Sequence, residues 1–130
     1  MTRNSGLKLF FDGGCRPNPG PLETAVVARG ITYHDPAAGH GTNNDAEWLA
    51  LLHALEIARN LAADDIELVG DSALIVNQAK GVWKCRSPEL QAHHDAFRIL
   101  AAPFARIRIK HIRRSHNLAG IALERIRNGL

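Results

Sequence analysis

The stretch that decides the fold is Phe10-Phe11-Asp12-Gly13-Gly14-Cys15-Arg16-Pro17-Asn18-Pro19-Gly20. Apolar residues lead into Asp12, and the chain then changes to glycine and proline. This order predicts a buried strand over residues 7–12 that delivers one carboxylate at its end and is followed by a tight turn. Acids also stand at the edges of later elements, at Glu47 and Asp71.

Two further strands are expected to follow the turn in hairpin sequence, over residues 24–30 and 31–34. Pro17, Pro19 and Pro21 are expected to prevent regular pairing before Glu23, because proline has no N–H to donate to a ladder. Residues 35–40 are rich in turn formers and are expected to link this region to the first helix.

The remaining elements follow from apolar periodicity and helix start signals. The first helix is expected to begin at Asn44 or Asp45, one of which is its N-cap, and to reach about residue 61. A strand over 66–70, helices over 72–81 and 87–100, a strand with one basic face over 105–112 and a last helix capped by Asn117 complete the series. The predicted fold class is α/β: a five-stranded mixed sheet with three antiparallel strands first, flanked by helices, in a single domain over residues 1–130.

The composition excludes several classes of protein. The chain has 130 residues, 45% of them hydrophobic and 22% charged, and no apolar run of membrane-spanning length. Residues 1–4 lack the apolar core of a signal peptide, so a cytoplasmic location is expected. Cys15 and Cys85 are far apart and outside any metal-binding spacing, which indicates free thiols rather than a zinc site or a disulfide framework.

The net charge is only +3, but basic residues are concentrated in the last third of the chain. Such a surface suits a polyanion, whose phosphates supply non-specific affinity. A solvated basic face without a ligand is the alternative. The residues concerned are Arg106, Arg108, Lys110, Arg113, Arg114, Arg125 and Arg127, opposed only by Glu124.

Asp12, Glu47 and Asp71 are predicted to meet if the first strand is central and the strand before Asp71 lies beside it. Three carboxylates in one place repel each other, so a positive charge is expected among them. Oxygen ligands without histidine or cysteine favour Mg²⁺ or Mn²⁺ over zinc. Taken singly, each acid has a simpler explanation as a turn former, a helix-dipole partner or a cap.

The motifs around these acids resemble those of type 1 ribonuclease H, over about residues 7–123. The resemblance is to the variant of the family that lacks the extra basic helix, or handle. It implies the ribonuclease H-like fold and a hydrolase that cuts the RNA strand of RNA/DNA hybrids with two divalent metal ions, leaving a 5′-phosphate. The matching blocks are Asp12-Gly13-Gly14 with Pro17-Asn18-Pro19-Gly20, Thr42-Asn43-Asn44-x-Ala46-Glu47, Gly70-Asp71-Ser72, and Ile75-Val76-Asn77-Gln78 with Gly81-Val82-Trp83-Lys84.

By this resemblance, Asp12 bridges two Mg²⁺ ions (Mn²⁺ is also expected to support activity), and Glu47 and Asp71 are further ligands. Asn43 and Asn44 are expected to meet ribose 2′-hydroxyls, the group that separates RNA from DNA. Helix capping is the simpler role for Asn43, Asn44 and Thr42, and it is compatible with substrate binding. The resemblance also implies that Gln78 contacts the hybrid in the same groove and that Thr42 holds a DNA-strand phosphate. Trp83 is expected to line the DNA-strand channel, unless it is a core residue. Further substrate-binding residues are expected at Gly13, Asn18 and Arg114.

The sequence departs from the family at the fourth acid, because Ile121 stands where an aspartate is expected after Arg114 and Asn117. Three explanations are open: Asn117 supplies a neutral oxygen to the second metal, three carboxylates with water suffice, or the domain binds hybrid without cutting it. The first is preferred here, against a plain N-cap role for Asn117. His116 is the preferred histidine for product release or proton transfer, because it is expected in the loop before the last helix. His111 is the other histidine candidate, although its place in a strand is more typical of a histidine at the edge of the core. Arg113 or Arg114 could serve instead.

Three functions are therefore compared. A metal-dependent endoribonuclease acting on RNA/DNA hybrids is favoured, as a monomer with no protein partner and no membrane. A catalytically weak or inactive hybrid-binding module of the same fold is the main alternative. A nuclease of this fold that acts on DNA is the third, and the Asn43-Asn44 pair argues against it.

Overall fold

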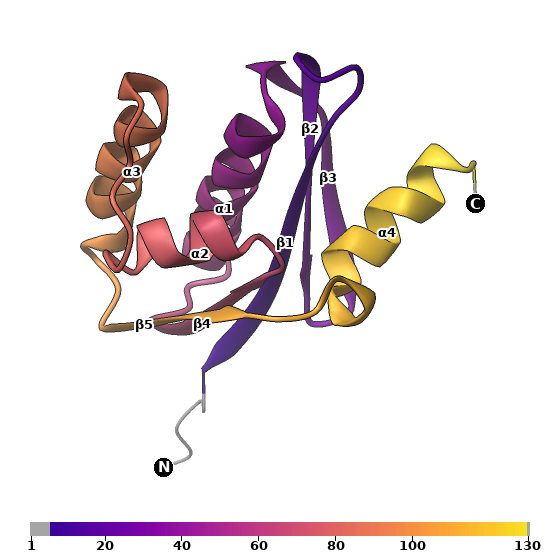
Figure 1. Ribbon diagram of the computed structural model, residues 1–130. Helices are drawn as coiled ribbons and strands as arrows, with labels where there is room; N and C mark the ends of the chain where they lie inside the picture. Colours follow the sequence, from indigo (N-terminus) through magenta and orange to yellow (C-terminus); the bar gives the residue numbers. More distant parts are fainter. Residues whose placement is uncertain (1–5, 130) are drawn as a thin grey trace.

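The computed structural model describes residues 6–129, which form a mixed sheet with helices on both faces (Figure 1). The strand order is β3-β2-β1-β4-β5, with β1 in the centre. The first three strands are antiparallel, whereas β4 joins β1, and β5 joins β4, in parallel. The predicted fold class is confirmed. The strands are β1 (Leu7–Cys15), β2 (Gly20–Ala28), β3 (Ile31–Gly41), β4 (Asp65–Gly70) and β5 (Arg106–His111).

Four α-helices cover this sheet. In Figure 1, α1, α2 and α3 lie on one side of the strands and α4 lies on the other. A short 3₁₀ turn, η1 (Arg114–His116), leads from β5 into α4. The helices are α1 (Asn43–Asn60), α2 (Ala73–Ala79), α3 (Pro88–Ala101) and α4 (Leu118–Arg127). None of the described helices is both long enough and apolar enough to span a bilayer.

The main core lies between the sheet and α1. Leu9 and Phe11 of β1, and Leu51 and Leu55 of α1, are at most 1% exposed. Burial of each such side chain contributes about 1.5–3 kcal/mol, so this layer fixes where α1 begins relative to β1. Trp48 is completely buried, and its Nε1 donates a hydrogen bond to Gln78 Oε1 at 3.0 Å, which ties α1 to α2.

The first strand is longer than predicted. It does not end at Asp12 but continues to Cys15, which pairs with Leu22 of β2. On the other side of β1, the parallel ladder with β4 ends at Phe10 and Val69. Asp12 therefore lies in mid-strand on the β2 side, beyond the last residue pair with β4, and the turn falls over residues 16–19.

The predicted limits of β2 and β3 were also wrong. β2 begins at Gly20, although the prolines were expected to prevent pairing before Glu23. Pro21 pairs with His40 of the outer strand β3 and lies beyond the last residue pair with β1. Its missing N–H therefore interrupts no ladder with β1. The predicted link over residues 35–40 belongs to β3. The register shifts between Thr24–Asp35 and Leu22–Gly39, so residues 36–38 bulge opposite a single residue of β2.

Neither Asn44 nor Asp45 is the N-cap of the first helix; the cap is Thr42, for which capping was the simpler role. The Asp45 N–H donates to Thr42 Oγ1, and the Thr42 N–H donates to Asp45 Oδ2. This reciprocal pair is a capping box, which leaves Asn43 and Asn44 in the first turn. Ser72, Ser87 and Asn117 cap α2, α3 and α4. The cap of α4 was predicted from the sequence. The predicted single domain over residues 1–130 includes ends that lie outside the described residues, so it stays a prediction.

Candidate active site

Asp12, Glu47 and Asp71 come together at the centre of the sheet. One carboxylate oxygen from each lies within 4.8 Å of the others, and all three residues are half-buried. Asp12 comes from mid-β1, Glu47 from the first turn of α1, and Asp71 from the residue after β4. The three acids therefore lie together, as the sequence predicted.

Gly13 allows the first turn of α1 to approach β1. A Cβ atom at this position would lie 2.1 Å from the Ala46 carbonyl oxygen, so only glycine fits. The Gly13 N–H donates a hydrogen bond to Glu47 Oε1 at 3.1 Å. The glycine thus holds the Glu47 carboxylate next to Asp12, and this role differs from the substrate contact predicted for Gly13.

A second glycine sets the place of Asp71. Gly70 faces the ring of Phe11, where a Cβ atom would lie 2.3 Å from the nearest ring carbon. Phe11 is completely buried and directly precedes Asp12 in the chain. The Phe11 ring of β1 therefore fills the space beside Gly70 of β4. The next residue of each chain segment is an aspartate, and Asp12 and Asp71 lie close together.

Burial and mutual repulsion both raise the pKa values of Asp12 and Glu47. Burial, and then the charge of Asp71, raise the pKa of Asp12 to about 6, against the opposing effect of Arg114 and Arg127. Burial, followed by the charges of Asp12 and Asp71, raises the pKa of Glu47 well above its usual value. The carboxylates of Asp12 and Glu47 therefore resist ionisation. Together with Asp71 they form a set of hard oxygen ligands suited to a divalent cation such as Mg²⁺ or Mn²⁺.

Asn117 is buried at this site, and its orientation follows from its partners. Its Nδ2 faces the Phe11 carbonyl at 3.0 Å, which can only accept a hydrogen bond, and its Oδ1 faces the Ala119 N–H at 3.1 Å, which can only donate. The same Nδ2 donates to Asp71 Oδ2 at 2.9 Å. The cap role of Asn117 is confirmed, whereas the amide oxygen needed for the predicted metal contact faces away from the acids.

The first turn of α4 lies directly beside the acids. A Cβ atom at Gly120 would be 3.3 Å from Asp12 Oδ2 and 3.7 Å from Asp71 Oδ2. The next residue, Ile121, is 38% exposed, although it is a large apolar side chain. Ile121, at the position where the family pattern has an acid, thus directly follows the residue that lies beside Asp12 and Asp71, and its side chain is exposed to solvent.

The histidine that contacts Asp71 is His111, whereas His116 was the preferred candidate. His111, the last residue of β5, is exposed, and its Nε2 lies 3.2 Å from the backbone oxygen of Asp71. His116 is exposed in η1, and no hydrogen bond joins it to a site residue among the described residues. His111 had been expected at the edge of the core, but its exposure and its contact make it the better candidate for proton transfer.

The predicted RNA-contacting pair, Asn43 and Asn44, is exposed at the start of α1. The Asn43 N–H donates to Asn18 Oδ1 at 3.1 Å, so the turn after β1 supports the start of this helix. Thr42 Oγ1 donates to Asp45 Oδ2 at 3.1 Å within the capping box, so its hydroxyl already has an acceptor. These four predicted substrate residues therefore lie together on one surface, with Asn18 in a supporting position.

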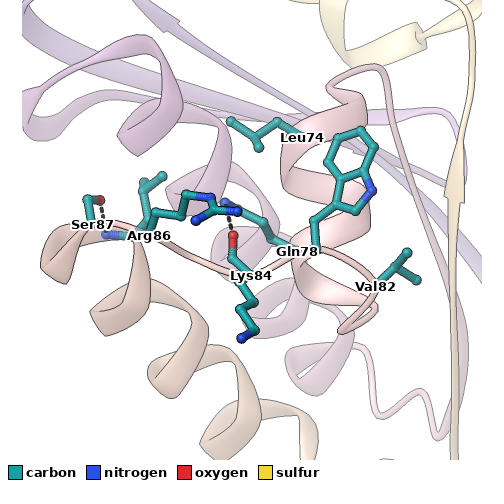
Figure 2. Close-up of a pocket in the computed structure, with 8 residues that line it drawn as sticks. Leu74, Gln78, Val82, Lys84, Arg86 and Ser87 are labelled. Carbon is teal, nitrogen blue, oxygen red and sulfur yellow. Dashed lines mark hydrogen bonds between the residues drawn. The ribbon is translucent and has the colours of Figure 1, made fainter.

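A groove of about 550 Å³ runs between α2 and the start of α3 (Figure 2). Gln78 is only 2% exposed at its base, and its amide is held between Trp48 and the Lys84 carbonyl. The predicted contact of Gln78 with substrate has no support in this arrangement. Trp83 is 48% exposed, which excludes the core alternative. Lys84 and Arg86 give the groove positive charge.

Arginines flank the acids. Arg114 is exposed in η1, and its positive charge acts to lower the pKa of Asp12. Its contact with substrate stays a prediction. Arg127 acts on Asp12 as well, although it is at the other end of α4 and no site role was predicted for it. Gly120 and Arg127 are the site residues that the sequence did not reveal, because each takes its place through the docking of α4 on the sheet.

Comparison with known proteins identifies the family. Residues 25–123 match the family model described as Reverse transcriptase-like. The chain is 36% identical over 126 residues to Ribonuclease HI of Halobacterium salinarum, which covers 93% of this chain and 63% of that protein. It is 35% identical over 112 residues to the bifunctional protein Rv2228c of Mycobacterium tuberculosis, covering 82% and 31%. The chain thus spans less than two thirds of the length of these curated relatives.

Solved structures agree over the whole fold. RNase H1 from the archaeon Halobacterium salinarum has a TM-score of 0.87 at 34% identity, covering 97% of this chain and 100% of that one. The N-terminal RNase H domain of Rv2228c has a TM-score of 0.81 at 30% identity, covering 95% and 97%. LC11-RNase H1, solved with an RNA/DNA hybrid, has a TM-score of 0.79 at 31% identity, covering 90% and 92%. The chain belongs to the type 1 ribonuclease H family.

Proposed function

We propose that this protein is an endoribonuclease that hydrolyses the RNA strand of RNA/DNA hybrids and leaves a 5′-phosphate. The observation that carries the proposal is the meeting of Asp12, Glu47 and Asp71, whose ligand oxygens lie within 4.8 Å of one another. Family membership implies a divalent metal, and the donor set suits it. We propose two Mg²⁺ ions per site, with Mn²⁺ as an active substitute.

Bound divalent ions would activate water and stabilise the leaving oxygen of the scissile phosphate. Asp12, Glu47 and Asp71 would hold these ions through their carboxylate oxygens. His111 would exchange a proton with the departing product, because its imidazole is exposed next to Asp71. Asn117 would act through Asp71 rather than as a ligand, since its amide nitrogen faces that carboxylate.

The substrate class is supported by the surface beside the acids. Exposed Asn43 and Asn44 offer amide groups at the start of α1, where ribose 2′-hydroxyls of an RNA strand would be recognised. The groove with Trp83, Lys84 and Arg86 offers an aromatic face and two cations for the DNA strand. The structural neighbour LC11-RNase H1 was solved with such a hybrid, and we extend that substrate to this chain. We propose that it acts as a monomer in the cytoplasm.

The test is cleavage of a labelled RNA/DNA hybrid with Mg²⁺ or Mn²⁺, set beside double-stranded DNA of the same sequence. Glu47→Gln is expected to abolish cleavage of the hybrid, because it removes one ligand charge. Glu56→Gln is the matched control, since Glu56 is exposed on the same helix and outside the site. Intact RNA after incubation with the wild-type protein would refute the activity, and cutting of the DNA duplex would point to a different nuclease.

A second function is favoured by one observation, the exposed Ile121 at the position of the fourth acid. A domain without that acid would bind a hybrid through the same surface and leave it uncut. Direct binding of the hybrid in EDTA and in Mg²⁺, measured together with turnover, separates the two. Tight binding without any metal-dependent product supports the binding module, and multiple turnovers exclude it.

A further inference from the structure

The last turn of α4 is fixed to the sheet by one ion pair. Arg127 Nε donates to Glu23 Oε2 of β2 at 2.9 Å. The other oxygen of Glu23 lies 2.9 Å from His34 Nε2 of β3. Although burial acts to raise it, the hydrogen bonds from His34 and Arg127 lower the pKa of Glu23. This carboxylate is therefore ionised near neutral pH and links α4 to two strands.

The pair is more sheltered than an ordinary surface pair. The Arg127 and Glu23 side chains are 21% and 23% exposed, so solvent screens them only in part. The guanidinium lies across Gly14, the cross-strand partner of Glu23, where any Cβ atom would collide with Arg127 Nη2. Nη2 is hidden from water and has no hydrogen-bond partner among the described residues. Gly14 thus provides the space that Arg127 occupies.

The rest of α4 is weakly packed. Its only buried residues are Ala119 and Leu123, whereas Leu118, Ile121 and Ile126 are between 38% and 46% exposed. Two buried side chains, one of them an alanine, give little hydrophobic free energy for holding a helix in place. Polar contacts at the two ends must therefore fix its position: Asn117 at the first turn and Arg127 at the last.

The two ends are coupled because a ten-residue helix of about 15 Å moves as a rigid rod. A shift at Arg127 would carry Asn117 away from Asp71 and Gly120 away from Asp12. We propose that Arg127 is a positioning residue, which through its ion pair with Glu23 across Gly14 keeps the first turn of α4 in register with the acids. The proposal deepens the proposed function and rests on it for its effect on metal binding.

The test uses Arg127→Gln, Arg127→Lys and Glu23→Gln, with Arg125→Gln as the control on the same turn, because Arg125 is exposed and forms no ion pair among the described residues. Three quantities are measured well below the melting temperature: Mn²⁺ binding by calorimetry without substrate, amide hydrogen exchange over residues 117–121, and hybrid cleavage. Arg127→Gln and Glu23→Gln are expected to weaken Mn²⁺ binding by about tenfold, the usual size of an effect on supporting residues of a metal site. Both variants should also speed amide hydrogen exchange over residues 117–121. Arg127→Lys should keep most of the wild-type Mn²⁺ affinity and most of the wild-type protection from exchange.

The proposal is overturned if Arg127→Gln lowers only the melting temperature and keeps the wild-type Mn²⁺ affinity and the wild-type amide exchange rates over residues 117–121. The ion pair would then be purely structural. Equal effects of Arg125→Gln would do so too, because the result would then reflect net charge. If the wild-type protein neither binds Mn²⁺ nor cuts the hybrid, the proposed function fails. In that case the amide exchange rates over residues 117–121 alone test the positioning role. Unchanged rates in Arg127→Gln and Glu23→Gln refute it, and faster rates in both variants support it.

Discussion

The Asn117 amide nitrogen donates a hydrogen bond to Asp71 Oδ2 at 2.9 Å, while the amide oxygen of the same side chain caps α4. One buried side chain therefore joins the start of the last helix to a carboxylate of the site. The third contact, to the Phe11 carbonyl, leaves no freedom to turn the amide over. Asn117 is thus a support for an acid rather than a substitute for the missing one.

Asn117→Ala is expected to reduce both stability and metal-supported activity. Loss of the cap costs about 1 kcal/mol, and each buried partner left without a hydrogen bond costs about 1–3 kcal/mol more. Asp71 would also lose its orientation, so the Mg²⁺ concentration for half-maximal cleavage should rise by about tenfold. Urea unfolding and Mg²⁺ titrations of cleavage measure the two effects.

Ser87→Ala is the matched control, because Ser87 caps α3 in the same way and makes no contact with the acids. It should lose stability by a similar cap energy and keep the wild-type dependence on Mg²⁺. An Asn117→Ala protein that unfolds earlier but titrates with Mg²⁺ like the wild type would show that the contact with Asp71 has no effect on the metal site.

The metal-free protein is expected to lose stability as the pH rises through about 6. The pKa of Asp12 is raised to about 6 in the folded chain from 3.8, chiefly by burial. A raised pKa means that the folded state holds the proton more tightly, so the contribution is complete below pH 3.8 and is lost as the pH rises through about 6. Because about one pH unit of this shift lies above pH 5, urea unfolding in EDTA at pH 5 and pH 7.5 should differ by about 1.4 kcal/mol.

Two histidines change the stability in the opposite direction over the same pH range, because burial lowers the pKa of His53 and of His94. Comparison of the wild type with Asp12→Asn separates the effect of Asp12 from theirs, because both proteins contain these histidines. The variant should be more stable than the wild type in EDTA at pH 7.5 and should lose that advantage at pH 5. It should also be inactive, and Mg²⁺ should no longer raise its melting temperature. An identical pH dependence of unfolding in both proteins would show that Asp12 does not carry the repulsion.

Ile121→Asp restores the acid that the family pattern has at this place. Because Ile121 is 38% exposed and lies one residue from Gly120, the new carboxylate should join the site with a stability change within about 0.5 kcal/mol. Mg²⁺ should then bind several-fold more tightly, and cleavage at low Mg²⁺ should increase. The measurement is the Mg²⁺ dependence of initial rates.

Leu118→Asp provides the comparison for this change. Leu118 is 46% exposed on the same turn of α4, so an aspartate there has the same charge and the same favourable effect on the helix dipole. It should leave the Mg²⁺ dependence close to that of the wild type. Equal gains from both variants would mean that a general negative charge, and not a fourth ligand, is responsible.

The three acids could be predicted from the sequence because each stands at a boundary between an apolar run and a helix or turn signal. Strand order then brought them together, since the carboxyl end of β4 lies beside mid-β1. The limits of the strands were less predictable. The extension of β1 to Cys15 and the bulge in β3 depend on pairing with β2, and such pairing overrides local glycine and proline signals.

The roles of Asn117, His111 and Arg127 required the structure. Spacing placed Asn117 near the acids, but only its three hydrogen bonds show which atom faces Asp71. His111 and His116 both precede the last helix, and the register of β5 against β4 is what brings His111 next to Asp71. Arg127 lies fifty-six residues beyond Asp71 in the chain, so no local pattern connects it with the site.

Gly13→Ala tests whether the close approach of α1 to β1 builds the metal site. The added methyl group would collide with the Ala46 carbonyl, so α1 must move and Glu47 must lose its hydrogen bond from the Gly13 N–H. Overpacking of this kind costs about 1–3 kcal/mol. Gly30→Ala is the control, because its φ of +76° makes alanine unfavourable by a similar strain in an open turn. Both variants should unfold at lower urea concentration, but only Gly13→Ala should lose Mn²⁺ affinity in calorimetry. Equal Mn²⁺ affinity in the two would show that the position of Glu47 does not depend on Gly13.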